Sequence, residues 1–63
     1  MSIGEQIRQA RTKRGLSQAG LAKEAGVSRP TVARVELGVP ISIATLTKLT
    51  AALGLRVELR SAK

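Results

Sequence analysis

The 63-residue sequence contains eleven Lys or Arg residues against four Glu, which gives a formal net charge of +7 at pH 7. A chain of this length allows one domain with a small core, and the absence of Cys excludes disulfides and thiolate metal sites as a means of stabilising it. Without His, Cys, Asp or Tyr, the four scattered glutamates offer no acid–base pair or nucleophile. We therefore expect neither an enzyme nor a protein that binds a metal or a cofactor.

The charge and the lack of aromatic residues narrow the class of partner. A compact domain with this excess of positive charge is typical of proteins that bind a polyanion. The chain has no aromatic side chains on which single-stranded bases could stack, whereas binding of duplex DNA requires none. No apolar run approaches the length of a membrane span and no signal-peptide pattern is present, so we expect a cytoplasmic protein that does not enter a membrane.

The first predicted helix runs from Ile3 to Arg14. The segment from Ser2 to Glu5 has the form of a capping box, and Gly15 follows the last helical residue. Ile3, Ile7 and Ala10 share one face of this helix. Three basic residues lie off that face, where they either form a solvated surface or contact phosphate: Arg8, Lys13 and Arg14.

Two further short helices are predicted at Gln18–Ala25 and Arg29–Leu37. Ser17 and Ser28 can cap them, and Gly26 lies where a left-handed conformation is favourable only without a Cβ atom. The apolar positions of the pair are Leu21, Ala22, Ala25, Val27, Val32 and Val35. Small residues at the turn let the two helices cross steeply at close range, which is the geometry of a helix-turn-helix.

The second of these helices has two distinct faces. A step of 100° per residue places Val32 and Val35 inward. The opposite face carries Arg29, Pro30, Ala33, Arg34 and Leu37. Arginine can bond guanine O6 and N7 with two hydrogen bonds, and Ala or Pro can contact a thymine methyl group, so this face suits the major groove. A solvated helix face is the alternative reading of both arginines.

A fourth helix is predicted after Ser42 and ends at Gly54. Its buried stripe is predicted to contain Ile43, Leu46, Leu49 and Leu53. The preceding segment, Leu37–Ile41, is apolar, so its side chains either pack under the fourth helix or form a surface that faces a partner. Packing into the core is the reading that we favour.

The last part of the chain alternates as a short strand does. Leu55, Val57 and Leu59 alternate with charged residues, and a lone strand in a helical domain needs a partner to complete its hydrogen bonds. If a two-fold axis passes near Val57, Arg56 faces Glu58 of a second copy and Leu55 faces Leu59. The sequence therefore predicts a homodimer that is formed through Leu55, Arg56, Val57, Glu58 and Leu59.

The centre of the chain resembles the helix-turn-helix of phage repressor and Cro-type (XRE-like) regulators, without gaps from Arg11 to Gly54. The matching segments are Leu16-Ser17-Gln18-Ala19, Leu21-Ala22, Ala25-Gly26-Val27-Ser28, and Arg34-Val35-Glu36 followed by Gly38. The resemblance implies an all-α repressor-like domain of four short helices over residues 1–54. Residues 55–63 would then be a C-terminal β-strand and tail, paired across a dimer.

The resemblance also implies roles for individual residues. Arg11 corresponds to the positive residue that pairs with the acidic residue at Glu36, which borders the interior on a helical wheel. The candidates for base contact are Arg29, Pro30, Ala33 and Arg34. The candidates for contact with the DNA backbone are Gln18, Ser17, Ser28 and Thr31. The sequence departs from the family pattern at two places. Gly20 stands where the family usually has Glu. The apolar segment Leu37–Ile41 stands where the family has a polar stretch, so the family's phosphate contacts in that stretch are not assigned to this chain.

These features predict a transcriptional regulator, more specifically a repressor, that binds a palindromic operator as a homodimer. The tail also resembles that of HipB-like antitoxins, which makes an antitoxin with a toxin protein as partner the alternative function. A cationic membrane-active peptide is a third reading, but four short, capped helices favour a folded domain.

Overall fold

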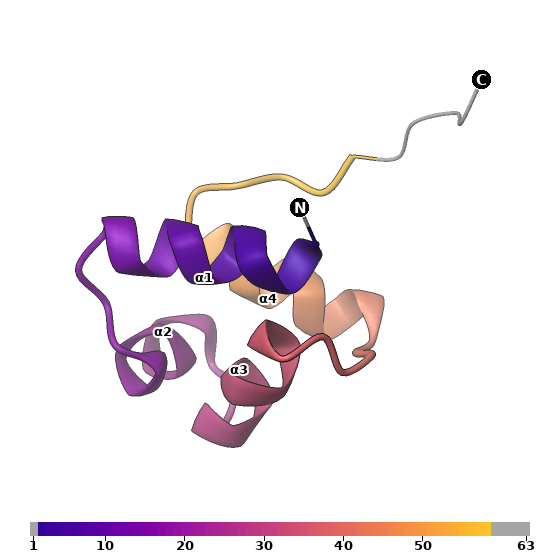
Figure 1. The fold of residues 1–63 in the computed structure, drawn as a ribbon, viewed down its shortest axis with the longest axis horizontal. Coiled ribbons are helices and arrows are strands. Elements are labelled where there is room, and N and C mark those ends of the chain that lie inside the picture. The colour runs from indigo at the N-terminus through magenta and orange to yellow at the C-terminus, as the bar shows by residue number, and fades with distance from the viewer. Residues whose placement is uncertain (1, 59–63) are drawn as a thin grey trace.

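The computed structural model describes residues 2–58, and within that range the fold is all-α (Figure 1). The helices are α1 (Ile3–Lys13), α2 (Gln18–Ala25), α3 (Arg29–Glu36) and α4 (Ile43–Ala52). The four predicted helices are confirmed. The first, third and fourth end one residue earlier than predicted, because Arg14, Leu37 and Leu53 are C-caps. None of the helices in this range is long and apolar enough to cross a membrane.

A serine precedes each helix and fixes where it begins. The hydroxyl groups of Ser2, Ser17, Ser28 and Ser42 each accept a hydrogen bond from the backbone N–H three residues later, over 3.2, 2.9, 3.3 and 3.1 Å. Each bond satisfies one of the donors that the first helical turn leaves free. Gly26 ends α2 with φ 72° and ψ 34°, the left-handed conformation that the turn requires. These local signals set the boundaries of the helix-turn-helix.

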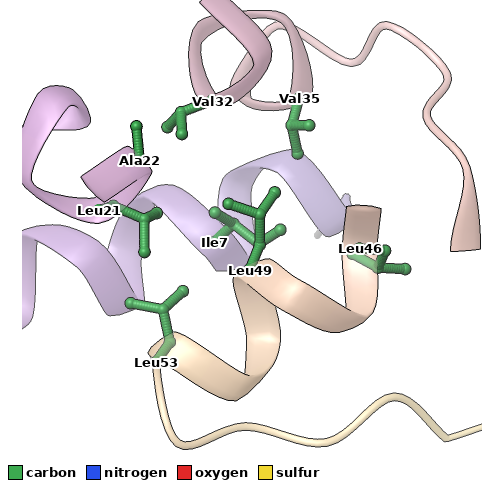
Figure 2. Packing of buried hydrophobic residues seen from close by; sticks show 8 residues of the cluster. All are labelled: Ile7, Leu21, Ala22, Val32, Val35, Leu46, Leu49 and Leu53. Atoms are coloured by element: carbon green, nitrogen blue, oxygen red, sulfur yellow. The ribbon is translucent and has the colours of Figure 1, made fainter. Parts of the chain in front are cut away.

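All four helices contribute to one aliphatic core (Figure 2). The buried residues are Ile7, Leu21, Ala22, Val32, Val35, Leu46, Leu49 and Leu53. Ile7 from α1 and Leu49 from α4 lie near the middle of the cluster in Figure 2, with the side chains of α2 to their left and those of α3 above them. The core thus holds α3 against the other three helices through Val32 and Val35.

The prediction that Ile43 is buried is wrong, because 71% of this residue is exposed. Ile43 is the first residue of α4, one turn before the buried Leu46, and it opens onto a surface hollow rather than the core. In the preceding segment the packing reading holds for Ile41, which packs against the core, but not for Val39, which is 44% exposed. Helical periodicity alone does not show where a helix extends past the elements that cover it.

Residues 55–58 follow α4 as an extended tail beside α1 (Figure 1). The tail starts with a hydrogen bond of 2.8 Å from the N–H of Leu55 to the carbonyl of Thr50. Together with Ile3 and Ile7 of α1 the tail borders a hollow of about 180 Å³, and it pairs as a strand with no other segment of residues 2–58. Leu59 of the predicted strand lies outside the described residues, and pairing across a dimer remains a prediction.

Helix α1 approaches α3 very closely at Gly4, which is buried. A Cβ atom built on Gly4 would overlap the carbonyl oxygen of Val35 and lie 3.2 Å from that of Glu36. The start of α1 therefore rests directly on the backbone at the end of α3. Sequence reasoning treated Gly4 only as part of the capping box and missed this contact.

Candidate nucleic-acid interface

Helix α3 presents one face to the core and the opposite face to solvent. Val32 and Val35 are 0% and 3% exposed, whereas Arg29, Pro30 and Arg34 are exposed. Pro30 lies within the first turn, where a backbone N–H would have no acceptor inside the helix, so its lack of an N–H breaks no helical hydrogen bond. The fourth candidate for base contact, Ala33, is partly buried on the same helix. The structure therefore places these four residues on the side of α3 that faces away from Val32 and Val35, as a major-groove reader requires.

The N-terminal cap of α3 involves two of the predicted backbone-contacting residues: Ser28 is the N-cap and Thr31 is its hydrogen-bond partner. Ser28 Oγ accepts from the N–H of Thr31, and it lies 2.7 Å from Thr31 Oγ1 in a second hydrogen bond. Ser17 Oγ accepts from the N–H of Gly20 at the start of α2. A serine hydroxyl that accepts from a cap N–H still has a proton to donate, so capping by Ser17 is compatible with a hydrogen bond to phosphate.

Arg11 of α1 and Glu36 of α3 form a two-pronged ion pair. Arg11 Nε lies 2.6 Å from Glu36 Oε2, and Arg11 Nη2 lies 3.0 Å from Glu36 Oε1. The two side chains are 11% and 6% exposed, and Arg11 Nη1 also donates to the carbonyl of Leu16. The pair implied by the resemblance is thus present, and it is nearly buried. Its geometry is the bidentate kind that gives the strongest hydrogen bonds between charged groups.

Gln18 joins this pair from a third helix. Its Nε2 donates to Glu36 Oε1 over 3.2 Å, and the side chain is partly buried at the start of α2. Glu36 therefore links α1, α2 and α3, and Gln18 has a positioning role besides the phosphate contact that the resemblance implies. No signal in the sequence pointed to this contact, since it joins residues on separate helices.

The surroundings of Glu36 also set its ionisation. Burial by itself would raise the pKa of Glu36, but the hydrogen bonds from Arg11 and Gln18 and the positive charges of Arg11 and Arg8 outweigh it. The pKa of Glu36 consequently lies below its ordinary value. The hydrogen bond to Glu36 raises the pKa of Arg11, although the burial of Arg11 by itself would lower it.

At neutral pH we expect the wild type to have a higher free energy of unfolding than Glu36→Gln, and we expect this difference to shrink as the pH falls. A carboxylate whose pKa is lower in the folded state stabilises the fold above about pH 5, and this contribution disappears as the pH falls through the lowered pKa. The other three glutamates are common to both proteins and cancel in the comparison. Urea unfolding of both proteins from neutral to acid pH measures the gap. A gap that stays constant would contradict the assigned shift.

Arg8 lies beside the outward side of α3, which the sequence alone did not establish. It borders an open hollow of about 300 Å³ together with Gln18, Ala33 and Leu37. Lys13, on the same helix, instead borders a hollow next to Leu55 of the tail. Of these two basic residues of α1, the structure places only Arg8 next to α3, where a DNA strand that follows the groove would pass.

The comparisons with known proteins agree with this arrangement. A family model described as helix-turn-helix matches residues 7–59. Among solved structures, the chain is similar to one from a complex described as "SinR protein/SinI protein complex", with a TM-score of 0.79 and 34% identity over 86% of this chain. The chain spans about half the length of that protein, 54% of it. Comparison with curated protein sequences gives no match.

The family match and the structural match each cover most of the chain. In this chain the serine caps, the left-handed Gly26 and the buried Arg11–Glu36 pair hold the helix-turn-helix in place. The chain therefore belongs to the repressor-type (XRE-like) family of helix-turn-helix domains.

Proposed function

We propose that this protein is a transcriptional regulator, acting as a repressor, that binds duplex DNA sequence-specifically and reads the major groove with α3. The observation that carries the proposal is the separation of the two faces of α3, with two exposed arginines opposite two fully packed valines. A rigidly mounted helix with free Arg side chains can bond guanine edges, and its small apolar residues can contact thymine methyl groups. Membership of the helix-turn-helix family and the net charge of +7 support the same conclusion.

Selection of duplex DNA by the purified protein tests this proposal, followed by the variants Arg29→Ala and Arg34→Ala. We expect a defined sequence to be enriched, and each variant to lose about 1–3 kcal/mol of discrimination at particular base pairs. Lys13→Ala, remote from α3, is the matched control and should leave base preference unchanged. Enrichment of no sequence, or loss of preference in Lys13→Ala alone, would contradict the assigned reading face.

Removal of the Arg8 charge should weaken DNA binding equally on all sequences. Each phosphate contact contributes about 0.9 to the slope of log affinity against log salt concentration, so Arg8→Gln is expected to reduce the slope by about 1 for each copy bound, or about 2 for a dimer. Lys13→Gln removes the same charge from the same helix but on the other side, and we expect it to leave the slope nearly unchanged. Equal slopes in the two variants would show that Arg8 contributes only general charge. Titrations at several salt concentrations measure both.

The homodimer is part of this proposal. Two copies of α3 on a palindromic operator would meet half-sites about 34 Å apart, and the self-complementary tail, Leu55–Leu59, supplies a means of pairing. An antitoxin role is the second candidate, because the exposed Val39 and Ile43 offer a partner protein an apolar surface. Co-purification of a second protein with the chain from its source, held by that surface, would favour this candidate.

A further inference from the structure

Two apolar hollows adjoin on the side of the molecule formed by α1, α4 and the loop before α4. The larger, about 360 Å³, lies between Ile3, Val39 and Ile43, and the smaller, about 180 Å³, lies under the tail at Leu55 and Val57. Both are bordered by Ile3 and by Leu46, so they form one continuous surface. We call it the Ile3–Ile43 face; its exposed apolar residues are Ile3, Val39, Ile43, Leu55 and Val57.

This face gathers nearly all of the exposed large apolar residues within residues 2–58. Five of the six large apolar residues that are exposed within residues 2–58 belong to it. The sixth, Leu37, is 83% exposed and borders the hollow beside Arg8 and α3 instead. A continuous apolar surface of this kind on a small domain marks a place where another molecule binds.

The charges around the face indicate which molecule that is. The ionisable residues that border the two hollows are Arg56 and Glu58, whose charges cancel. The chain as a whole carries +7, so two copies repel each other wherever their basic surfaces meet. The Ile3–Ile43 face is the large apolar surface on which like copies can meet without that repulsion. Arg56 and Glu58 are also spaced so that each meets its opposite across a two-fold axis.

We propose that a second copy of this chain covers the Ile3–Ile43 face, so that Ile3, Val39 and Ile43 form a dimer interface continuous with the paired tails. The proposal rests on the proposed function and extends it, because it assigns an interface beyond the tail to the homodimer. The outward face of α3 is not part of this surface. One copy can therefore bind its mate and a DNA half-site at the same time.

The test measures the mass of the full chain in solution without DNA, by sedimentation over a range of concentrations. We expect the wild type to sediment with twice its 6.6 kDa mass. Ile43→Lys places a charge in the interface and should raise the dimer dissociation constant by about tenfold or more. Leu37→Lys adds the same charge at a residue that is even more exposed but lies beside α3, and it should leave the dimer intact.

Both variants change exposed side chains, so unchanged helicity and thermal midpoint confirm that each is folded. A monomeric wild type, an unaffected dimer in Ile43→Lys, or equal effects of the two variants would each overturn the proposal. A monomer that is held in a complex with a different protein would do so as well. Binding of the same proteins to a single DNA half-site is measured separately. A dimer that does not bind DNA would refute the proposed function but not the proposed interface.

Discussion

Replacement of Arg11 by methionine is expected to lower the free energy of unfolding by about 3–5 kcal/mol. The change leaves the carboxylate of Glu36, 6% exposed, without its cationic partner, and it leaves the carbonyl of Leu16 without a donor. A domain of 63 residues has little stability in reserve, so a large fraction of the variant should be unfolded at room temperature. Urea unfolding followed by circular dichroism measures the loss.

The double variant Arg11→Met/Glu36→Met separates the cost of an orphaned charge from the value of the pair. Replacement of both partners of a buried ion pair by apolar residues is often neutral, whereas removal of one partner is costly. We therefore expect the double variant to be more stable than Arg11→Met. A double variant no more stable than Arg11→Met would show that the orphaned carboxylate is not the source of the loss.

Gly4→Ala should destabilise the fold by about 1–3 kcal/mol, although alanine normally stabilises a helix relative to glycine by about 1 kcal/mol. The new Cβ atom would overlap the carbonyl of Val35, a backbone atom that cannot turn aside, so α1 and α3 must move apart. Gly20→Ala is the matched control, because its Cβ would meet only the hydroxyl of Ser17, at 3.2 Å, and side-chain atoms of Leu16. Thermal unfolding of both variants measures the difference.

A Gly4→Ala variant as stable as the control would show that α1 can shift without cost. If the expected loss is found, DNA binding supplies a second readout, because α3 carries the proposed base-contacting residues. Displacement of α3 should then weaken sequence-specific binding at temperatures at which the variant is still folded.

Local chemistry made much of this fold predictable from the sequence. Serine at each helix start and Gly26 at the turn act through atoms within a few residues, and the structure has them as predicted. The inward positions of α3 follow from helical geometry alone. The Arg11–Glu36 pair needed the resemblance, because its partners are 25 residues apart.

What sequence reasoning missed depends on how separate elements meet. The exposure of Ile43 depends on which element covers the start of α4, and the need for Gly4 depends on how closely α1 approaches α3. The bond from Gln18 to Glu36 and the position of Arg8 beside α3 likewise join residues from different helices. A one-dimensional pattern specifies the face of a helix but not its neighbours.

The linkage of three helices at Glu36 has a consequence for the thermodynamics of binding. Because Arg11 and Gln18 hold the end of α3 to α1 and α2, the reading helix is ordered before it meets a ligand. Association then involves no coupled folding, and its heat-capacity change should match the apolar area that the interface removes from water, without the larger negative value that accompanies the ordering of a flexible segment.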